Sequence, residues 1–99
     1  MFRSTLRADL DAAALGELEA VGTRMATLAA TMPGFVSYKD FAAPDGENVT
    51  VVEFETMEAQ LQWRAHPEHA AAQRAARERY FAEYKISVCS VLRVATHSV

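Results

Sequence analysis

The chain has 99 residues, a formal net charge of −3 at pH 7, and a composition that is 51% hydrophobic and 23% charged. A chain of this length builds one small core, so we expect a single domain over residues 1–99. The composition excludes a disordered chain, and the negative charge argues against a nucleic-acid partner, which needs a concentrated basic face. We expect no membrane partner and a cytoplasmic location, because no apolar stretch approaches the roughly 20 residues of a membrane span and the N-terminus lacks a signal-peptide core.

The chain has few of the side chains that form disulfides, structural metal sites or phosphate-binding surfaces. Cys89 is the single cysteine, which excludes an intrachain disulfide and a thiolate cluster for a structural metal. We expect it to be a small buried side chain. Three arginines between positions 74 and 79 are interleaved with glutamates, a pattern typical of a solvated helix face rather than of a phosphate-binding surface.

The hydrophobic period predicts the elements of the first half of the chain. Residues 2–7 alternate apolar and polar side chains, a weak strand pattern. Small and apolar residues then recur in steps of three and four from Leu15 to Met32, which predicts an amphipathic helix that ends at "MPG". The runs "GFVSYKDF" and "NVTVVEF" flank the turn residues Pro44, Asp45 and Gly46, so they predict an antiparallel hairpin.

Helix-forming residues dominate from Met57 to Tyr80 and are interrupted once, at Pro67. Proline suits the first position of a helix, so we expect His66 to be the preceding cap and Glu68 to be a favourable anion in the first turn. The segment is thereby divided into a short helix over 57–65 and a longer one from 67 to about 80. The sequence "YKISVCSVLRV" at 84–94 alternates and predicts a long closing strand.

The resulting order, βαββαβ, predicts a ferredoxin-like α+β fold in which helices cover one face of a four-stranded antiparallel sheet. The other face of the sheet is expected to be open. We expect the less apolar side of the closing strand, with Cys89 and Val91, to lie on this open face beside Phe35 or Val49. A half-apolar open face usually meets a partner, so we predict a homodimer formed through the sheets.

The stretch "WRAHPEHAAAQ" contains two histidines, which raises the question of a metal site. His66 and His69 are three residues apart, whereas two helical histidine ligands usually lie four apart, and no third ligand is near them in the sequence. We therefore expect no metal. Purely structural roles for these residues stay open as alternatives. In that case His69 is a hydrogen-bonded histidine at the edge of the core, and Trp63 and Tyr80 are core anchors.

One face of the longer predicted helix is narrow and built of small residues. His69 and Tyr80 stand at its two ends, with Ala72 and Ala76 between them. Such a face suits close packing against a sheet, and the alanines leave room for a ligand.

The segments "MPGFVSYKDF" and "DGENVTVVEFETMEAQLQWRAHPEHAAAQRAARERYFAEYKISVCSVLR" resemble the antibiotic biosynthesis monooxygenase family of small dimeric α+β barrels. The resemblance runs from about Met32 to Arg93, and more loosely over the first strand and helix. Its most specific part is the combination of "PGF", the tryptophan, "HPEH" and the closing "YKISV". The resemblance implies a ferredoxin-like protomer that packs its sheet on that of a second copy, with a pocket between each sheet and its helices.

The family includes cofactor-free oxygenases, so the resemblance implies, as a first hypothesis, an enzyme that acts on an electron-rich aromatic such as a quinol, anthrone or polyketide-like molecule. Molecular oxygen is a triplet and reacts slowly with closed-shell molecules. The protein must therefore convert the substrate to an anion, which needs a base, anion-stabilising donors and a dry pocket. His69 is the expected base and His66 the second choice. The expected substrate-binding residues are Trp63, Phe35, Tyr38, Arg64, Gln73, Arg77 and Tyr80, with Arg64 or Arg77 stabilising the anion.

Two alternatives come from other members of the same family. A non-catalytic binder or accessory protein for a small aromatic or polyketide intermediate would use the same pocket without a titrating base. Heme-degrading relatives carry an Asn on the first strand and a heme-ligating His ten residues after the tryptophan. Here the tenth residue after Trp63 is Gln73, and the first strand has no Asn, so we favour a protein without heme and expect no cofactor.

Overall fold

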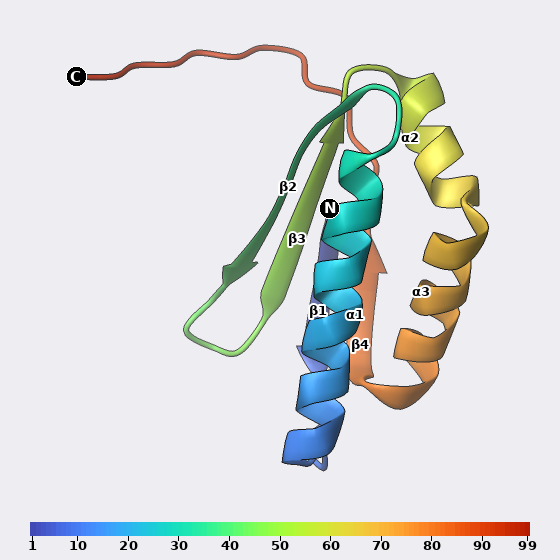
Figure 1. Cartoon of the computed structure of the whole chain (residues 1–99). Helices are drawn as coiled ribbons and strands as arrows, with labels where there is room; N and C mark the ends of the chain where they lie inside the picture. The colour runs from blue at the N-terminus through green and yellow to red at the C-terminus, as the bar shows by residue number, and fades with distance from the viewer.

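The computed structural model describes all residues from 1 to 99 and has the predicted ferredoxin-like α+β architecture (Figure 1). In chain order its elements are β1 (Phe2–Leu6), α1 (Ala12–Ala30), β2 (Phe35–Ala42), β3 (Asn48–Phe54), α2 (Met57–Ala65), α3 (Pro67–Arg79) and β4 (Phe81–Ile86). The four strands form one antiparallel sheet in the order β2-β3-β1-β4. No helix is long and apolar enough to cross a membrane.

Local chemistry sets the start of each helix. The Asp11 carboxylate accepts the Ala14 N–H at 2.8 Å and caps α1, and the Thr56 hydroxyl accepts the Ala59 N–H at 3.1 Å and caps α2. Between α1 and β2, Gly34 has a φ of 76°, a left-handed conformation that glycine adopts without a steric penalty. This turn places Gly34 against Ala59 of α2.

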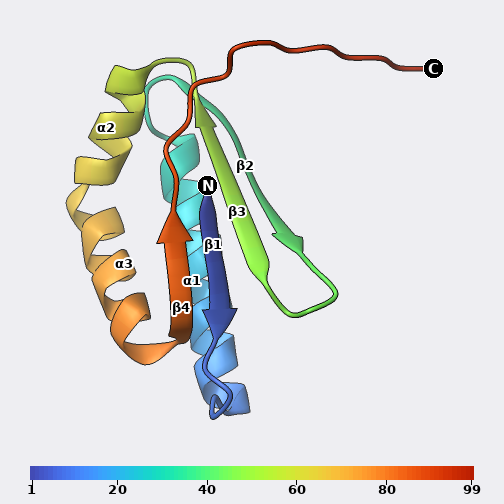
Figure 2. The ribbon, with the colours of Figure 1, turned by 180° about the vertical axis from the view of Figure 1, so that it is seen from behind.

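The helices lie on one side of the sheet, and Figure 2 shows the opposite side with β1, β3 and β4 in front of the helices. Side chains of directly paired residues point to the same face. Tyr38 pairs with Val52 and Ser4 pairs with Tyr84 on the helix side. The uncovered face carries a mixture of charged and apolar side chains, from Arg3, Lys39, Phe41, Val49, Val51, Glu53, Glu83 and Lys85.

The core is small. Its buried cluster is Met25, Leu28, Ala29 and Trp63, and only 8 of the 99 residues are buried. The chain exposes 7208 Å² of accessible surface, whereas a compact monomer of this mass exposes about 5,600 Å². The excess indicates that a large part of the surface is not packed within one protomer.

The closing strand is shorter than predicted. β4 ends at Ile86, and the residues after it form no regular element and extend away from the fold (Figure 1). The reason is the neighbouring strand: the Ser87 N–H donates to the Met1 carbonyl at 2.8 Å, and residues after Ser87 lie past the end of β1. The expectation of a strand over 84–94 was therefore wrong beyond Ile86, and Cys89 is exposed rather than buried.

The predicted content of the uncovered sheet face also needs one correction. Phe35 packs against the core cluster on the helix side, because its strand partner Phe54 lies there too. Val49 lies on the uncovered face as expected, opposite Phe41. Cys89 and Val91 lie beyond β4 and are not part of the sheet.

Candidate functional site

Trp63 and His69 form a stacked pair at the centre of the candidate site. Trp63, in the last turn of α2, is only 4% exposed, and its indole lies 6.4 Å from the Phe54 ring. The imidazole of His69, in the first turns of α3, lies on the indole with a centroid distance of 4.1 Å and an interplanar angle of 20°. The predicted role of Trp63 as a core anchor is confirmed, and the stack fixes the plane of the His69 ring.

Pro67 determines which hydrogen bond His69 makes. In a continuous helix the carbonyl of Trp63 would accept the N–H of the residue at position 67, but proline has none. The Trp63 carbonyl lies instead 3.1 Å from the His66 N–H and 3.1 Å from His69 Nδ1. Because a carbonyl only accepts, His69 Nδ1 carries the proton and its Nε2 carries a lone pair.

The surroundings of His69 favour its neutral form. Burial of the imidazole lowers the pKa of His69 below its ordinary value of 6.5, the hydrogen bond to Trp63 opposes this shift, and the charge of His66 adds to it. A neutral imidazole with a free Nε2 lone pair is a proton acceptor near pH 7. His69 therefore has both the protonation state and the tautomer of a general base.

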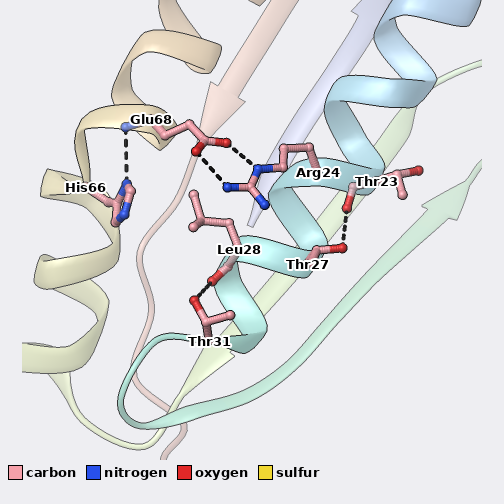
Figure 3. Close-up of polar contacts among 7 residues, drawn as sticks. All are labelled: Thr23, Arg24, Thr27, Leu28, Thr31, His66 and Glu68. Atoms are coloured by element: carbon pink, nitrogen blue, oxygen red, sulfur yellow. Dashed lines mark hydrogen bonds and ion pairs between the residues drawn. The ribbon is translucent and has the colours of Figure 1, made fainter.

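His66 has a structural task, as the sequence predicted. Its Nδ1 accepts the backbone N–H of Glu68 at 3.1 Å and so caps α3. Glu68 binds Arg24 of α1 through two hydrogen bonds of 2.6 and 2.9 Å, as Figure 3 shows. In this cap the Nδ1 lone pair of His66 accepts a backbone N–H. In His69, by contrast, Nδ1 carries the proton and donates it to a backbone carbonyl.

Tyr38 and Phe35 reach the same cluster from β2. Both pack against the buried core around Trp63, and the Phe35 ring meets that of Phe54 at 6.1 Å. Burial, with a contribution from the nearby Asp40 carboxylate, raises the pKa of Tyr38 to about 12. The phenol therefore stays protonated and can donate a hydrogen bond to an anion.

Two other predicted site residues lie at the far end of α3. Tyr80 is 3% exposed, and its hydroxyl donates to Glu17 Oε2 at 2.9 Å. Arg77 donates to the Tyr84 hydroxyl at 3.2 Å. Tyr80 follows His69 by eleven residues, which corresponds to about 16 Å along a helix. The structure thus divides the predicted residues between two ends of one helix.

The remaining predicted residues occupy intermediate places. Arg64 is exposed in the last turn of α2, and Gln73 is partly buried one turn after His69. Phe54 and Tyr84 were not among the predicted site residues, although strand alternation places Phe54 on the same face as Val52. The stack of His69 on Trp63 could not be anticipated from the sequence, because that contact depends on the angle between α2 and α3.

The surface has six hollows, and two of them are open and lie outside the cluster around Trp63. One, of about 580 Å³, lies on the outer side of α1 and is lined by Gly16, Glu19, Ala20, Thr23, Arg24 and Thr27. The other, of about 200 Å³, lies over β1 and β4 and is lined by Arg3, Ser4, Thr5, Glu47, Glu83, Tyr84 and Lys85. Neither hollow includes a predicted site residue, so neither is the pocket expected between the sheet and the helices. No three His, Cys, Asp or Glu side chains gather in a metal-binding arrangement.

Comparison with solved structures supports this fold. The structure of Rv0793 from Mycobacterium tuberculosis superposes with a TM-score of 0.79 and 23% identity, covering 96% of this chain and 94% of that one. SnoaB, a cofactor-independent oxygenase from Streptomyces nogalater, superposes with a TM-score of 0.66 and 23% identity, covering 92% and 91%. At these identities the likeness shows the shared fold.

Comparison of sequences extends the resemblance to the N-terminal strand and helix. The uncharacterized protein YqjZ of Bacillus subtilis (strain 168) is 37% identical over 70 residues, which is 71% of this chain and 61% of the relative's length. The sequence profile described as antibiotic biosynthesis monooxygenase matches residues 1–75, from β1 into α3. The chain belongs to the antibiotic biosynthesis monooxygenase family.

Proposed function

We propose that the protein is a cofactor-independent monooxygenase of an electron-rich aromatic substrate, such as a quinol, an anthrone or a polyketide-like phenol, with His69 as the base. The observation that carries this proposal is the His69 imidazole, held flat on Trp63 with Nδ1 bound to a carbonyl and Nε2 free. Family membership and the likeness in fold to the oxygenase SnoaB support it.

The proposed reaction begins with proton transfer from the substrate to His69 Nε2. The resulting anion gives one electron to oxygen, and the two radicals combine to form a carbon–oxygen bond. With an anthrone, the peroxide anion takes the proton back from His69, and the hydroperoxide then loses water, so that one oxygen atom enters the product as a carbonyl and the other leaves as water. The protonated phenol of Tyr38 donates to the anion.

Oxygen uptake tests this proposal directly. We expect uptake with dithranol, an anthrone, or with a quinol, and we expect one atom of ¹⁸O₂ in the product by mass spectrometry. The His69→Ala variant should lose most of the rate above the spontaneous background. If uptake with every anthrone and quinol equals the protein-free rate, the proposal is wrong.

A non-catalytic binder or accessory protein for an aromatic intermediate is the second candidate. The observation in its favour is the stack itself, because a histidine packed on Trp63 and bonded to its carbonyl has a structural role at the edge of the core that needs no titration. A thermal-shift assay distinguishes this candidate. A binder is stabilised by aromatic ligands, takes up no oxygen with them, and keeps its ligand affinity when His69 Nε2 is removed.

We also propose that the protein is a homodimer formed through the uncovered sheet face. The apolar side chains on that face support this: Phe41, on the edge strand β2, is 50% exposed and lies opposite Val49 of β3. Specific interfaces bury about 800 Å² on each partner, which is less than the excess of this chain over a compact monomer, an excess that also includes the extended residues after Ile86.

A further inference from the structure

Arg77 differs from the other arginines that make side-chain contacts. The structure has three ion pairs: Arg3 with Glu47, Arg24 with Glu68, and Arg79 with Glu17. Arg77 instead donates Nη1 to the hydroxyl of Tyr84 at 3.2 Å, and its guanidinium lies 5.7 Å from the centre of that ring. A neutral phenol leaves the positive charge without a counter-charge and most of the five guanidinium N–H donors free.

An aromatic surface lies beside this cation. The Tyr84 ring lies 5.9 Å from that of Phe2 at an angle of 31°, and the Phe2 ring meets Phe81 edge-on at 5.2 Å. Tyr84 is 43% exposed and Ile86 is 49% exposed, although both are on the helix side of β4. The helices therefore leave part of this aromatic and aliphatic surface open.

The Arg77 cluster is connected to the candidate base along α3. His69, Gln73 and Arg77 follow one another at intervals of four residues, so they form one ridge on the helix. Arg77 lies eight residues after His69, or about 12 Å along the axis. The contact between Arg77 and Tyr84 shows that this ridge turns toward β4.

We infer that Arg77, Tyr84 and Phe2 form a subsite for the acidic end of an anionic polycyclic aromatic ligand. The ligand's carboxylate takes the guanidinium fork of Arg77 through two parallel hydrogen bonds in place of the Tyr84 hydroxyl. Its fused rings lie on Tyr84 and Phe2 and extend along the ridge toward His69. The position of the reacting ring at His69 rests on the proposed function, whereas the acid subsite itself does not.

The test uses anthracene-2-carboxylate and its neutral analogue 2-(hydroxymethyl)anthracene as fluorescent probes in equilibrium titrations. We expect Arg77→Gln to weaken binding of the carboxylate by roughly ten-fold, because hydrogen bonds to a charged group are lost. Binding of the neutral probe should change less than about two-fold. Arg74→Gln is the matched control, since it removes the same charge from an exposed position of the same helix. It should leave both affinities nearly unchanged.

Tyr84→Leu supplies a second measurement, because it removes the ring and keeps an apolar side chain. It should weaken both probes by a similar factor, since both lose the same stacking surface. Equal losses from Arg77→Gln and Arg74→Gln would mean that general electrostatic attraction explains the binding, and the subsite would be disproved. An unchanged carboxylate affinity in Arg77→Gln would disprove it as well.

The subsite and the proposed oxygenase can fail separately. Arg77-dependent preference for the carboxylate without oxygen uptake supports the subsite and rejects the enzyme. Oxygen uptake without any such preference supports the enzyme and rejects the subsite.

Discussion

His69 and Trp63 are held together by two contacts at once: their rings stack at 4.1 Å, and the Trp63 carbonyl lies 3.1 Å from His69 Nδ1. The stack fixes the plane of the imidazole, and the hydrogen bond fixes its rotation and its tautomer. In the proposed reaction, an imidazole held in this way needs no rearrangement before it takes a proton.

The two histidines should differ sharply in their effect on activity. His69→Ala should lower kcat by at least about 100-fold, since general bases contribute about 10² to 10⁴-fold. His66→Ala should lower kcat by less than about ten-fold but destabilise the fold by about 0.5–2 kcal/mol, because it removes the cap of α3. The measurements are oxygen uptake and urea unfolding. Small and equal losses of activity from both changes, with the fold intact by circular dichroism, would favour the binder.

Acid should lower both stability and activity through His69. Its pKa is depressed in the folded state by burial, so between that pKa and about 6.5 the unfolded chain binds more protons than the folded protein. The resulting stability is complete above about pH 6.5 and is lost as the pH falls through the folded pKa. We expect kcat/KM to fall on the acid side with a midpoint below 6.5. His69→Asn should flatten the dependence of the melting temperature on pH in this range, and an acid midpoint above 6.5 would contradict the assignment.

Replacing Pro67 should disturb the tautomer of His69. Pro67→Ala supplies an N–H that competes for the Trp63 carbonyl, because this residue is the natural helical donor to position 63. We expect the ¹⁵N shifts of the His69 ring to move from the Nδ1–H form toward a mixture of tautomers, with a fall in kcat of several-fold. Pro44→Ala, in the distant hairpin turn, is the control and should leave the ring shifts unchanged. Unaltered His69 shifts in Pro67→Ala would show that the proline has no such role.

Gly34 should be intolerant of a side chain. Its φ is 76°, and an added Cβ would lie 2.8 Å from the Cβ of Ala59. We expect Gly34→Ala to lower the free energy of unfolding by at least about 2 kcal/mol, from the left-handed backbone and the clash together. Gly16→Ala is the control, because an added Cβ there meets nothing within 4 Å. It should stabilise α1 by about 0.5–1 kcal/mol in denaturant unfolding.

A charge among the apolar side chains of the uncovered sheet face should separate the protomers of the proposed dimer. Phe41→Glu should convert the dimer to a monomer of about half the mass in light scattering, since it buries an unpaired charge in the interface. Leu61→Glu is the matched control: Leu61 is also 50% exposed, but it lies on α2, away from this face. A wild-type protein that is monomeric at micromolar concentration would reject the assembly.

Much of the fold could be predicted because local signals agree with tertiary structure. His66 and Pro67 mark the junction of α2 and α3, and Pro44 to Gly46 mark the hairpin turn. The length of β4 could not be predicted in this way, because a strand extends only as far as the neighbouring strand with which it pairs. The pairing that ends β4 joins Ser87 to Met1, which are 86 positions apart in the sequence. The sequence predicted which side chains belong to the candidate site. It did not predict that they lie in two groups, one at each end of α3, because that depends on the tertiary structure.

The segment from Val88 to Val94 combines β-branched side chains with high exposure: Val88 is 51%, Val91 62%, Leu92 95% and Val94 71% exposed. An unpaired segment of this kind is a template for strand pairing with any other chain. This segment is therefore at risk of pairing with the same segment of other copies, and aggregation should become faster as the protein is concentrated.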